Sequence, residues 1–525
     1  MSYDPYEDDD FPRRARAGTW LRFLLAAVLI IVLTAGATAT AGLLNVQNFV
    51  DDLKAGGTIR GAERVITRAD AGDPQTILLI GSDHRYDAAR RDARSDTMML
   101  VRIDPDAAAT TVLSIPRDLR VTYTDAQGGV HGPTKINETY TVGGEALTAE
   151  VIRKLFRIPI NHIANINFRG FREAIDAIGC VYVDVDQRYY HSNIGLAASA
   201  QYAEIDINPG YQMMCGTRAL DYVRYRHTDS DLVRGARQQD FLRQIRSQYD
   251  ANDFINDPHK LTRIIGRRMQ TDKDLQSASA LIKLAQLVAF SASKPIQQVA
   301  ITPTYTTGSD GASYVEAGES EIARVRKEFL HPDAAPAAPK QQRGGGKGGR
   351  GGRKGGRATR APASERPSPE SLGLFDMTQT GKDYTIQLGP MNFPVYYPRY
   401  LPNSAGYMTP NTGAEGGYPI KYKTRAPDGK MKQAYRLVVS YGDPGNYMGV
   451  QGTTWKNPPI LNNPSSDHRT IDGKKLDLYY DGRRLRLVAW RTPQAVYWIS
   501  NTLEKRLSND QMLAIAGSLT RLGGR

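Results

Sequence analysis

Between residues 76 and 331 the pattern of apolar and polar positions alternates between two periodicities. Short apolar runs bounded by turn residues predict buried strands, namely TILLIGSD (76–83), TMMLVRID (97–104), TTVLSIPRD (110–118) and CVYVDVD (180–186). Segments with apolar residues three and four apart predict helices, namely TAEVIRKLF (148–156), FREAIDAIG (171–179), a long amphipathic helix within 219–249 and LQSASALIKLAQLVAF (275–290). This alternation predicts a layered α/β domain with a central mixed sheet.

The pattern changes after residue 370. Alternating, aromatic-rich segments predict strands at VYYPRY, AYRLVVSY, LDLYYD, RLRLVAW and AVYWIS, and NDQMLAIAGSLTRL (509–522) predicts a final helix. Residues 371–525 are therefore expected to form a separate, small β-rich α+β domain. Residues 332–370 contain RGGGKGGRGGRKGGR, which has too few apolar side chains to bury a core, so this segment is predicted to be a flexible Gly/Arg-rich linker.

Near the N-terminus, residues 23–44 form one uncharged, mostly apolar run. Its 22 residues are enough to cross a hydrocarbon layer of about 30 Å. Arginines precede the run, so the positive-inside rule predicts a cytoplasmic tail over 1–22 and places the connector at 45–75 and all later residues outside the cell membrane. A cleavable signal peptide ending near Ala39 is the alternative, and it also exports the rest of the chain.

Charge is spread unevenly along the 525 residues. The net charge is +13, yet residues 340–366 hold nine Lys or Arg against one acid, a net of +8. The basic balance therefore describes mainly the linker. This linker lacks the aromatic residues that stack on bases, and the predicted topology places it outside the cell, so no nucleic-acid partner is expected.

The two cysteines, Cys180 and Cys215, are consistent with export. An even cysteine count in an oxidising compartment predicts one disulfide. Two buried free thiols are the alternative. Neither residue lies in a CxxC motif, which argues against redox or metal chemistry.

Charged residues gather where the predicted strands begin and end. Asp83 and Arg85 follow the first strand, Arg94 and Asp96 precede the second, and Arg117 and Asp118 follow the third. If the first two strands run antiparallel, these residues meet at one edge of the sheet, where α/β proteins usually bind ligands. The alternative for any one Arg/Asp pair is a surface ion pair worth under about 1 kcal/mol.

A second group of cations lies further along the chain. Arg224 and Arg226 are two residues apart, and a helix starting near Asp231 would align Arg234 and Gln238 with two apolar positions. Lys135, in a segment (134–140) expected to be a loop, would add another cation. Carboxylates hold Mg²⁺ and arginines pair with phosphate oxygens, so the two groups together indicate a site for a magnesium-bound pyrophosphate.

Five motifs, in order behind one apolar segment, resemble those of the LytR-CpsA-Psr family of cell-wall glycopolymer ligases. They are ILLIGSDHR, RSDTMMLVRID, LSIPRD, KINETY and VRYRHTDSDLVRGARQQ, and the resemblance covers residues 76–331. It implies transfer of a phosphoglycan from a polyprenyl-pyrophosphate carrier to a peptidoglycan hydroxyl, with release of polyprenyl phosphate. It also implies a prenyl-tail site between sheet and helices, which 148–156 and 171–179 would line.

The resemblance also assigns residue roles. Asp83 and Asp96 would bind Mg²⁺, and Arg94 and Arg117 would contact the pyrophosphate. The remaining phosphate-binding residues would be Lys135, Arg224, Arg226, Arg234 and Gln238, while Arg85 and Arg237 also match the motifs. Two alternatives remain open: a polyprenyl-pyrophosphate hydrolase on the same fold, and a membrane-anchored regulator that binds anionic polymers.

Overall fold

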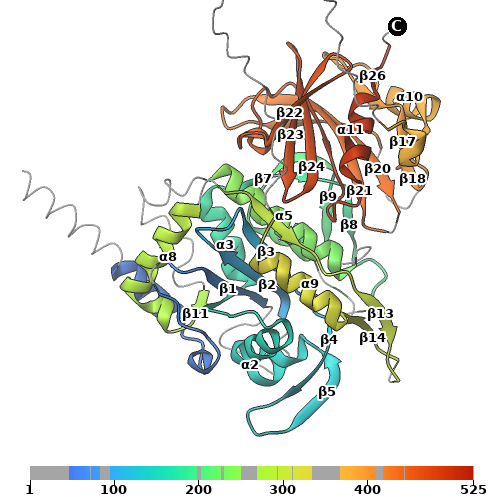
Figure 1. Ribbon diagram of the computed structural model, residues 1–525. Helices are drawn as coiled ribbons and strands as arrows, with labels where there is room; N and C mark the ends of the chain where they lie inside the picture. Colours follow the sequence, from blue (N-terminus) through green and yellow to red (C-terminus); the bar gives the residue numbers. More distant parts are fainter. Residues whose placement is uncertain are drawn as a thin grey trace, which may run out of the picture.

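The computed structural model describes most of the chain after residue 46 (Figure 1). The described residues are 47–70, 72–82, 95–197, 201, 203–225, 230–249, 269–291, 294–309, 311–333, 367–409, 418–442 and 444–523. The predicted tail, most of the linker and the predicted membrane span at 23–44 lie outside them. Within these ranges, no helix combines the length and the apolar character needed to cross a membrane.

A six-stranded mixed sheet forms the centre of the first domain, as predicted. Its order is β11 (Met269–Thr271), β6 (His162–Asn167), β1 (Gln75–Ser82), β2 (Ser95–Ile103), β3 (Thr110–Ser114) and β12 (Ile296–Val299). β1 pairs antiparallel with β2 and parallel with β6, while β3 pairs parallel with β12. The antiparallel β1–β2 pairing is the arrangement on which the predicted edge site depends.

Helices cover both faces of this sheet. On one face α2 (Glu138–Phe156) and α9 (Glu319–Leu330) bury Phe156 and Phe329 against Leu78, Leu100 and Leu113 of the central strands. On the other face lie α5 (Asp231–Gln248) and α8 (Ala278–Ser291), which pack on β3 and β2. The predicted layered α/β architecture is confirmed, and each apolar strand face has its own helical layer.

Smaller elements surround the sheet. A satellite core joins Phe241 of α5 to α3 (Phe168–Ile178), α4 (Gly216–Arg224) and two antiparallel strand pairs, β7–β10 (Val181–Val185 with Gly210–Met214) and β8–β9 (Tyr189–His191 with Ile205–Ile207). β13 (Thr304–Thr307) pairs with β14 (Ser313–Glu316). Residues 134–140 are not the expected loop: Lys135 ends the hairpin β4 (Arg120–Thr124)–β5 (Val130–Lys135), and α2 begins three residues later.

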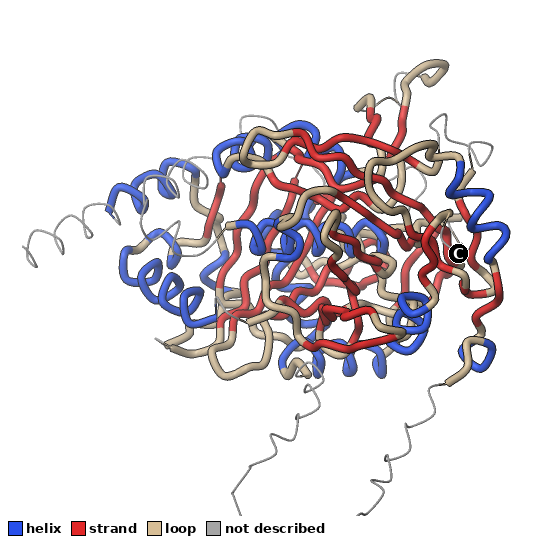
Figure 2. The backbone as a smooth tube through the Cα atoms, turned by 90° about the horizontal axis from the view of Figure 1, so that it is seen from above, coloured by secondary structure: helices blue, strands red, loops and turns tan. Residues whose placement is uncertain are grey.

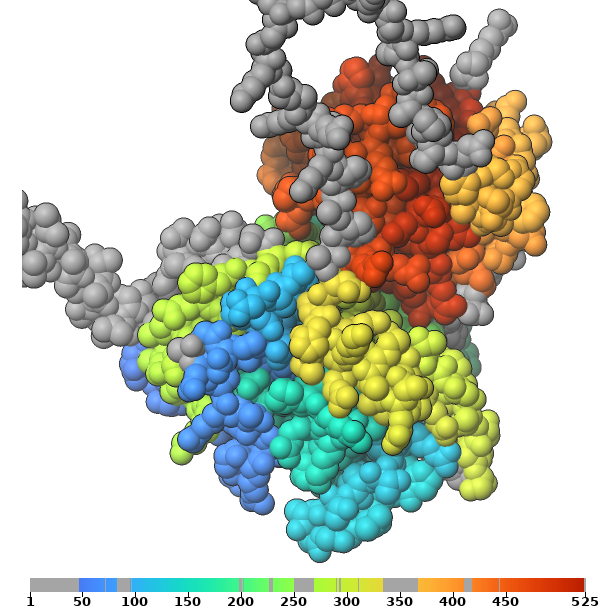
Figure 3. Space-filling view, in the orientation of Figure 1, coloured from blue at the N-terminus to red at the C-terminus, as the bar shows by residue number. Residues whose placement is uncertain are grey.

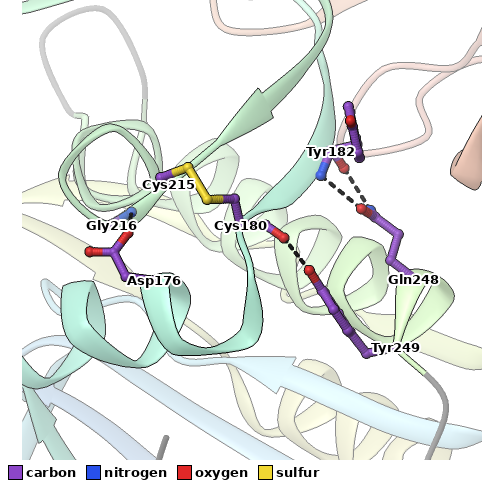
Figure 4. Close-up of a disulfide and its surroundings, with 7 residues drawn as sticks. All are labelled: Asp176, Cys180, Tyr182, Cys215, Gly216, Gln248 and Tyr249. Carbon is purple, nitrogen blue, oxygen red and sulfur yellow. Dashed lines mark hydrogen bonds between the residues drawn. A yellow bond between two sulfur atoms is a disulfide. The ribbon is translucent and has the colours of Figure 1, made fainter. Parts of the chain in front are cut away.

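The predicted disulfide between Cys180 and Cys215 is confirmed (Figure 4). It joins the start of β7 to the start of α4. Around it, Asp176 accepts a hydrogen bond from the Gly216 backbone at 2.7 Å, and the Tyr249 hydroxyl donates to the Cys180 carbonyl. The bridge therefore ties α3, α4 and the end of α5 together.

The second domain is β-rich, as the sequence predicts. Its antiparallel sheet runs β18 (Ala405–Tyr407), β20 (Met431–Tyr441), β21 (Tyr447–Thr453), β25 (Val496–Ser500), β24 (Arg484–Arg491), β23 (Lys474–Asp481) and β22 (Asp467–Ile471), with β19 (Ile420–Arg425) beside β20. Flanking it are α10 (Thr378–Ile386) and the short strands β15 (Leu374–Asp376), β16 (Tyr396–Pro398) and β17 (Tyr400–Pro402). The predicted final helix is shorter than expected: α11 spans Asn509–Gly517, and β26 (Leu519–Arg521) pairs with β16.

The two domains share a buried interface, although the sequence predicts a separate C-terminal unit. The tube view shows strands and helices packed closely through the molecule (Figure 2), and the space-filling view shows the C-terminal lobe in contact with the first domain (Figure 3). Tyr182 and Tyr211 of the first domain pack with Trp455 and Trp498 of the second. The C-terminal domain thus has its own core and packs against the first domain through a buried interface.

Candidate active site

The edge of the sheet where β1 and β3 end and β2 begins carries the candidate site. Ser82, the residue before Asp83, pairs with Ser95, the residue before Asp96. The register shifts at this point, because Gly81 pairs with Thr97 and Asp96 becomes an extra residue in a bulge, a feature common next to active sites. The register therefore brings the two chain positions before the predicted metal ligands together.

A buried network of hydrogen bonds holds the end of β1 in place. The Ser82 hydroxyl donates to the Asn165 side chain at 3.1 Å, and the Asn165 amide donates to Tyr140 at 3.0 Å and to Glu145 at 2.7 Å. All four residues are buried. A satisfied network of this kind makes the backbone rigid at the point where the predicted ligand segment begins.

Three of the predicted cations meet in one chain of ion pairs. Lys135 Nζ lies 3.0 Å from Asp118 Oδ1, and Arg117 Nε lies 3.6 Å from Asp118 Oδ2 and 3.3 Å from Asp231 Oδ2. On the other side of Asp231, its Oδ1 lies 3.0 Å from an Arg234 terminal nitrogen. The cluster contains three cations and two carboxylates, which leaves a net charge of +1.

Different elements position the members of this cluster. Arg117 and Asp118 lie in the β3–β4 loop, which the backbone bonds from Asn137 to Arg117 and from Val315 to Asp118 hold in place. Asp231 and Arg234 lie in the first turn of α5, whose N-cap Ser230 accepts a hydrogen bond from Val233. A helix N-terminus favours anions, so Arg234 adds its charge to a site that already attracts phosphate.

α5 approaches β3 closely because residue 235 is glycine. A Cβ atom there would lie 2.9 Å from Ser114 Cβ. Gln238, one turn further along, donates through its amide nitrogen to Thr97 at 2.9 Å and to the Val223 carbonyl at 3.1 Å. Gln238 therefore ties α5 to β2 and α4, and its two amide hydrogens are already used in doing so.

The other predicted cations lie in different surroundings. Arg224 pairs with Asp221 at 3.0 Å and lies over the Phe168 ring, and burial raises the pKa of the Asp221 carboxyl. Arg237 is fully buried, donates to the Tyr222 and Tyr225 carbonyls and packs on Tyr189. The geometry gives Arg237 an anchoring role inside the satellite core rather than a position on the edge. Asp83, Arg85, Arg94, Arg226 and the side chain of Asp96 lie outside the described residues.

The described residues allow a partial test for a metal. Asp118 and Asp231 are each within 3.6 Å of two cations, so neither is a favourable ligand for another one. Among the described residues, the only cluster with metal-ligand spacing is Asp176, Cys180 and Cys215, whose sulfurs form the disulfide. The predicted Mg²⁺ ligands, Asp83 and the side chain of Asp96, lie outside the described residues, so the Mg²⁺ site stays a prediction.

Two cavities follow α5 along its length. The polar one, about 30 Å³, lies between the first turns of α5 and the ends of β3 and β12, and its lining includes Thr97, Asp231, Arg234 and Gln238. The apolar one, about 620 Å³, lies further along the helix, against β1, β2, β3, β12 and α8, and Asn462 and Asn463 of the C-terminal domain also line it. Its lining includes Leu79, Val101, Ile103, Val112, Leu242, Ile245, Val288 and Ile296. The two predicted tail-lining segments, in α2 and α3, do not line this cavity.

This geometry agrees with a match to known proteins. Residues 46–330, more than half of the chain, match the LytR_cpsA_psr family. The chain belongs to this family. The match confirms the resemblance seen in the five motifs, and the C-terminal domain lies outside it.

Similar members of the family are named as transferases. The chain is 31% identical over 261 residues to polyisoprenyl-teichoic acid–peptidoglycan teichoic acid transferase TagU of Halalkalibacterium halodurans, covering 49% of this chain and 79% of that protein. It is 24% identical over 322 residues to TagT of Bacillus subtilis, covering 60% and 95%. A solved structure of TagT bound to LIIa-WTA is 25% identical, covers 52% of this chain and 97% of that one, and has a TM-score of 0.40.

Asp118 and Asp231 are the members of the cluster to which the sequence assigns no role. Both are visible in the sequence, Asp118 beside Arg117 and Asp231 three residues before Arg234. Spacing of i, i+3 between an acid and an arginine at a helix start indicates such a pair. It does not indicate that one carboxylate also reaches an arginine more than 100 residues away.

Proposed function

We propose that this protein transfers a glycopolymer from a polyprenyl-pyrophosphate carrier to a hydroxyl of peptidoglycan. The observation that carries the proposal is the succession of a cationic edge and an apolar cavity along α5. Arg234 and Ile245 are eleven residues apart, about 17 Å of helix. A ligand with a pyrophosphate head and a long apolar tail suits this order of surfaces.

The apolar cavity supports a prenyl tail as the occupant. Burial of hydrocarbon against Val101, Leu242 and Ile245 stabilises binding by about 25 cal/mol for each Å² removed from water. The head would then lie at the N-terminal end of α5. The polar cavity of about 30 Å³ holds no more than a water molecule or two, so the pyrophosphate would lie over its mouth.

The residues of the edge would act mainly by binding and charge stabilisation. The acceptor oxygen forms a bond to the phosphorus that carries the glycan, and the bond from this phosphorus to the bridging oxygen breaks. Polyprenyl phosphate leaves with the electron pair, and the acceptor proton passes to solvent. Arg117 and Arg234 would pair with phosphate oxygens, where their charge stabilises the leaving group.

Asp83 and Asp96 would hold Mg²⁺ in this proposal. When bound there, the ion would offset negative charge on the pyrophosphate oxygens. We also propose that residues 23–44 anchor the chain in the cell membrane with the catalytic domain outside, since the carrier lipid and the peptidoglycan acceptor meet at that surface.

Product analysis tests the proposed reaction. Full-length protein in nanodiscs is supplied with a polyprenyl-pyrophosphate glycan, Mg²⁺ and peptidoglycan fragments, and the products are identified by mass. A glycan joined to the fragment by a phosphodiester supports transfer. Free phosphoglycan, with water as the acceptor, would instead identify a hydrolase.

Variants of the edge connect the reaction to the site. Asp96→Ala is expected to abolish magnesium-dependent turnover, and Arg117→Ala and Arg226→Ala to weaken pyrophosphate binding. Lys154→Ala is the matched control, because Lys154 is exposed and pairs only locally with Glu150. Wild-type turnover in the edge variants would contradict the assigned site.

A further inference from the structure

The C-terminal domain reaches the candidate active site through one loop. Glu504, in the loop between β25 and α11, lines the same polar cavity as Asp231, Arg234 and Gln238. Its side chain is 15% exposed. The family match ends at residue 330, more than 170 positions before Glu504. Only the packing of the second domain against the first therefore brings this carboxylate to the cavity.

The loop that carries Glu504 is held rigidly within its own domain. The Asn501 amide donates to the carbonyls of Leu485 at 2.9 Å and Leu507 at 3.0 Å. Glu504 itself accepts hydrogen bonds from Asn446 at 2.9 Å and from Arg506 at 3.0 Å, both on Oε2. One carboxylate oxygen therefore fixes the side chain, and the other is not used by these contacts.

A buried ionic centre holds the same loop against the first domain. Asp481 lies 2.5 Å from Arg243 of α5 and 2.7 Å from Lys505, and accepts a bond from the Gln298 backbone at 2.9 Å. Lys505 also donates to the Gln298 side chain. Lys505, the residue next to Glu504, is thus fixed to β12 and, through Asp481, to α5, and both elements line the cavity.

Tyr305 of β13 stands beside this loop. Its hydroxyl lies near the carboxylates of Glu504 and Asp231, and the residue is 58% exposed. Burial of part of the ring, followed by the nearby carboxylates of Glu504 and Asp231, raises the pKa of the Tyr305 hydroxyl, which keeps it a donor. An exposed aromatic ring with a polar tip, beside a carboxylate, suits a ligand that carries both C–H faces and hydroxyl groups.

The direction of the proposed reaction places these two residues on the acceptor side. In an in-line displacement the acceptor enters opposite the leaving group. The leaving polyprenyl phosphate points along α5 toward the apolar cavity, so the acceptor approaches from the N-terminal end, where Ser230, Tyr305 and Glu504 lie. A carboxylate there repels phosphate but accepts a hydrogen bond from a hydroxyl.

We propose that the C-terminal domain completes the acceptor side of the active site, with Glu504 and Tyr305 binding the saccharide that receives the glycopolymer. This inference rests on the proposed transfer for its orientation. It assigns the second domain a role in acceptor recognition and makes Glu504 a residue that determines specificity.

Acceptor binding and acceptor kinetics together test the inference. Glu504→Gln preserves the shape of the side chain and leaves one oxygen for Asn446 and Arg506, and Tyr305→Phe removes only the hydroxyl. Each is expected to raise the KM for a peptidoglycan disaccharide-peptide about fivefold or more. Each should weaken the binding of this fragment, measured in the absence of the donor lipid, by the same factor. Affinity for the pyrophosphate lipid should change less than twofold. Glu319→Gln, in the exposed first turn of α9, is the control.

The outcomes separate this inference from the proposed function. Unchanged fragment binding and unchanged KM in both variants would overturn the inference while leaving transfer intact. Loss of fragment binding in the variants, combined with a wild type that only hydrolyses the carrier, would support the saccharide site and refute transfer. Equal loss of donor and acceptor binding would show a general disruption of the edge and would also overturn the assignment.

Discussion

Arg117 Nε and Asp231 Oδ2 lie 3.3 Å apart and join the β3–β4 loop to the first turn of α5. Asp231 also pairs with Arg234 at 3.0 Å, so one carboxylate orients two arginines from distant parts of the chain. Both arginine side chains are at most 14% exposed. The cationic edge is therefore preorganised by an acid that the ligand itself would not contact.

Asp231→Asn is expected to weaken pyrophosphate-lipid binding even though it adds positive charge to the edge. Two arginines lose the partner that orients them, and removing one member of a largely buried pair costs about 1–3 kcal/mol, roughly tenfold or more in affinity. Calorimetric titration with the lipid measures the loss. Asp51→Asn, at an exposed local pair, is the control. Tighter binding by Asp231→Asn would contradict the orienting role.

Gly235→Ala is expected to destabilise the protein by about 1–3 kcal/mol and to lower turnover. Alanine normally favours a helix, but here the new Cβ meets Ser114 Cβ at 2.9 Å and must push α5 and Arg234 away from the edge. Chemical denaturation and turnover are measured in parallel. Adding Ser114→Gly removes the opposing atom and should restore much of both. Failure of this rescue would indicate a different cause.

Trypsin cleavage within residues 340–366 is expected to leave the two domains associated. Asp184 lies 2.5 Å from Arg436 and accepts a bond from Trp498, all buried at the interface. Gel filtration of the cleaved protein should show a single peak with both fragments. Asp184→Asn should promote separation, because it leaves the Arg436 charge without its buried partner. The exposed Asp206→Asn serves as the control. Two peaks from the cleaved wild type would contradict a stable interface.

Because of Lys505, the free energy of unfolding is expected to change with pH in the alkaline range. Burial lowers the pKa of Lys505 to about 8 in the folded state, against an unfolded value of 10.5 and despite the opposing effect of Asp481. Above pH 8 the unfolded chain therefore holds a proton that the folded chain has released, so this group raises the free energy of unfolding as pH rises toward about 10. Tyrosine ionisation in the unfolded chain begins there and limits the window.

Comparison with Lys505→Met isolates this contribution. In denaturation experiments at pH 7.5, 8.5 and 9.5, the free energy of unfolding of the wild type relative to that of the variant should increase with each step in pH. Parallel pH profiles for the two proteins would show that Lys505 keeps the same pKa in the folded and unfolded states. Lys474, whose pKa burial also lowers, is present in both proteins and cancels in the difference.

The sequence by itself determined the local elements and much of the chemistry. Apolar runs such as 76–83 and 97–104 become strands because their side chains must leave water on both faces of a covered sheet. The start of α5 at Asp231 and the Cys180–Cys215 bridge were likewise predictable, since a helix-start pattern and an even cysteine count are local signals. The family motifs named Arg117, Lys135 and Arg234, which meet in one cluster.

Only the tertiary structure decided how these parts combine. Arg237 packs into a buried tyrosine cluster, and both amide hydrogens of Gln238 bond to neighbouring elements. The sequence motif alone does not distinguish these two residues from Arg234. The tertiary structure also brings Glu504 to the polar cavity and fixes the second domain on the first through Asp184 and Arg436. Such contacts depend on packing between different elements, in the case of Asp184 and Arg436 from segments 252 residues apart, where charge and shape complementarity, not periodicity, select the partner.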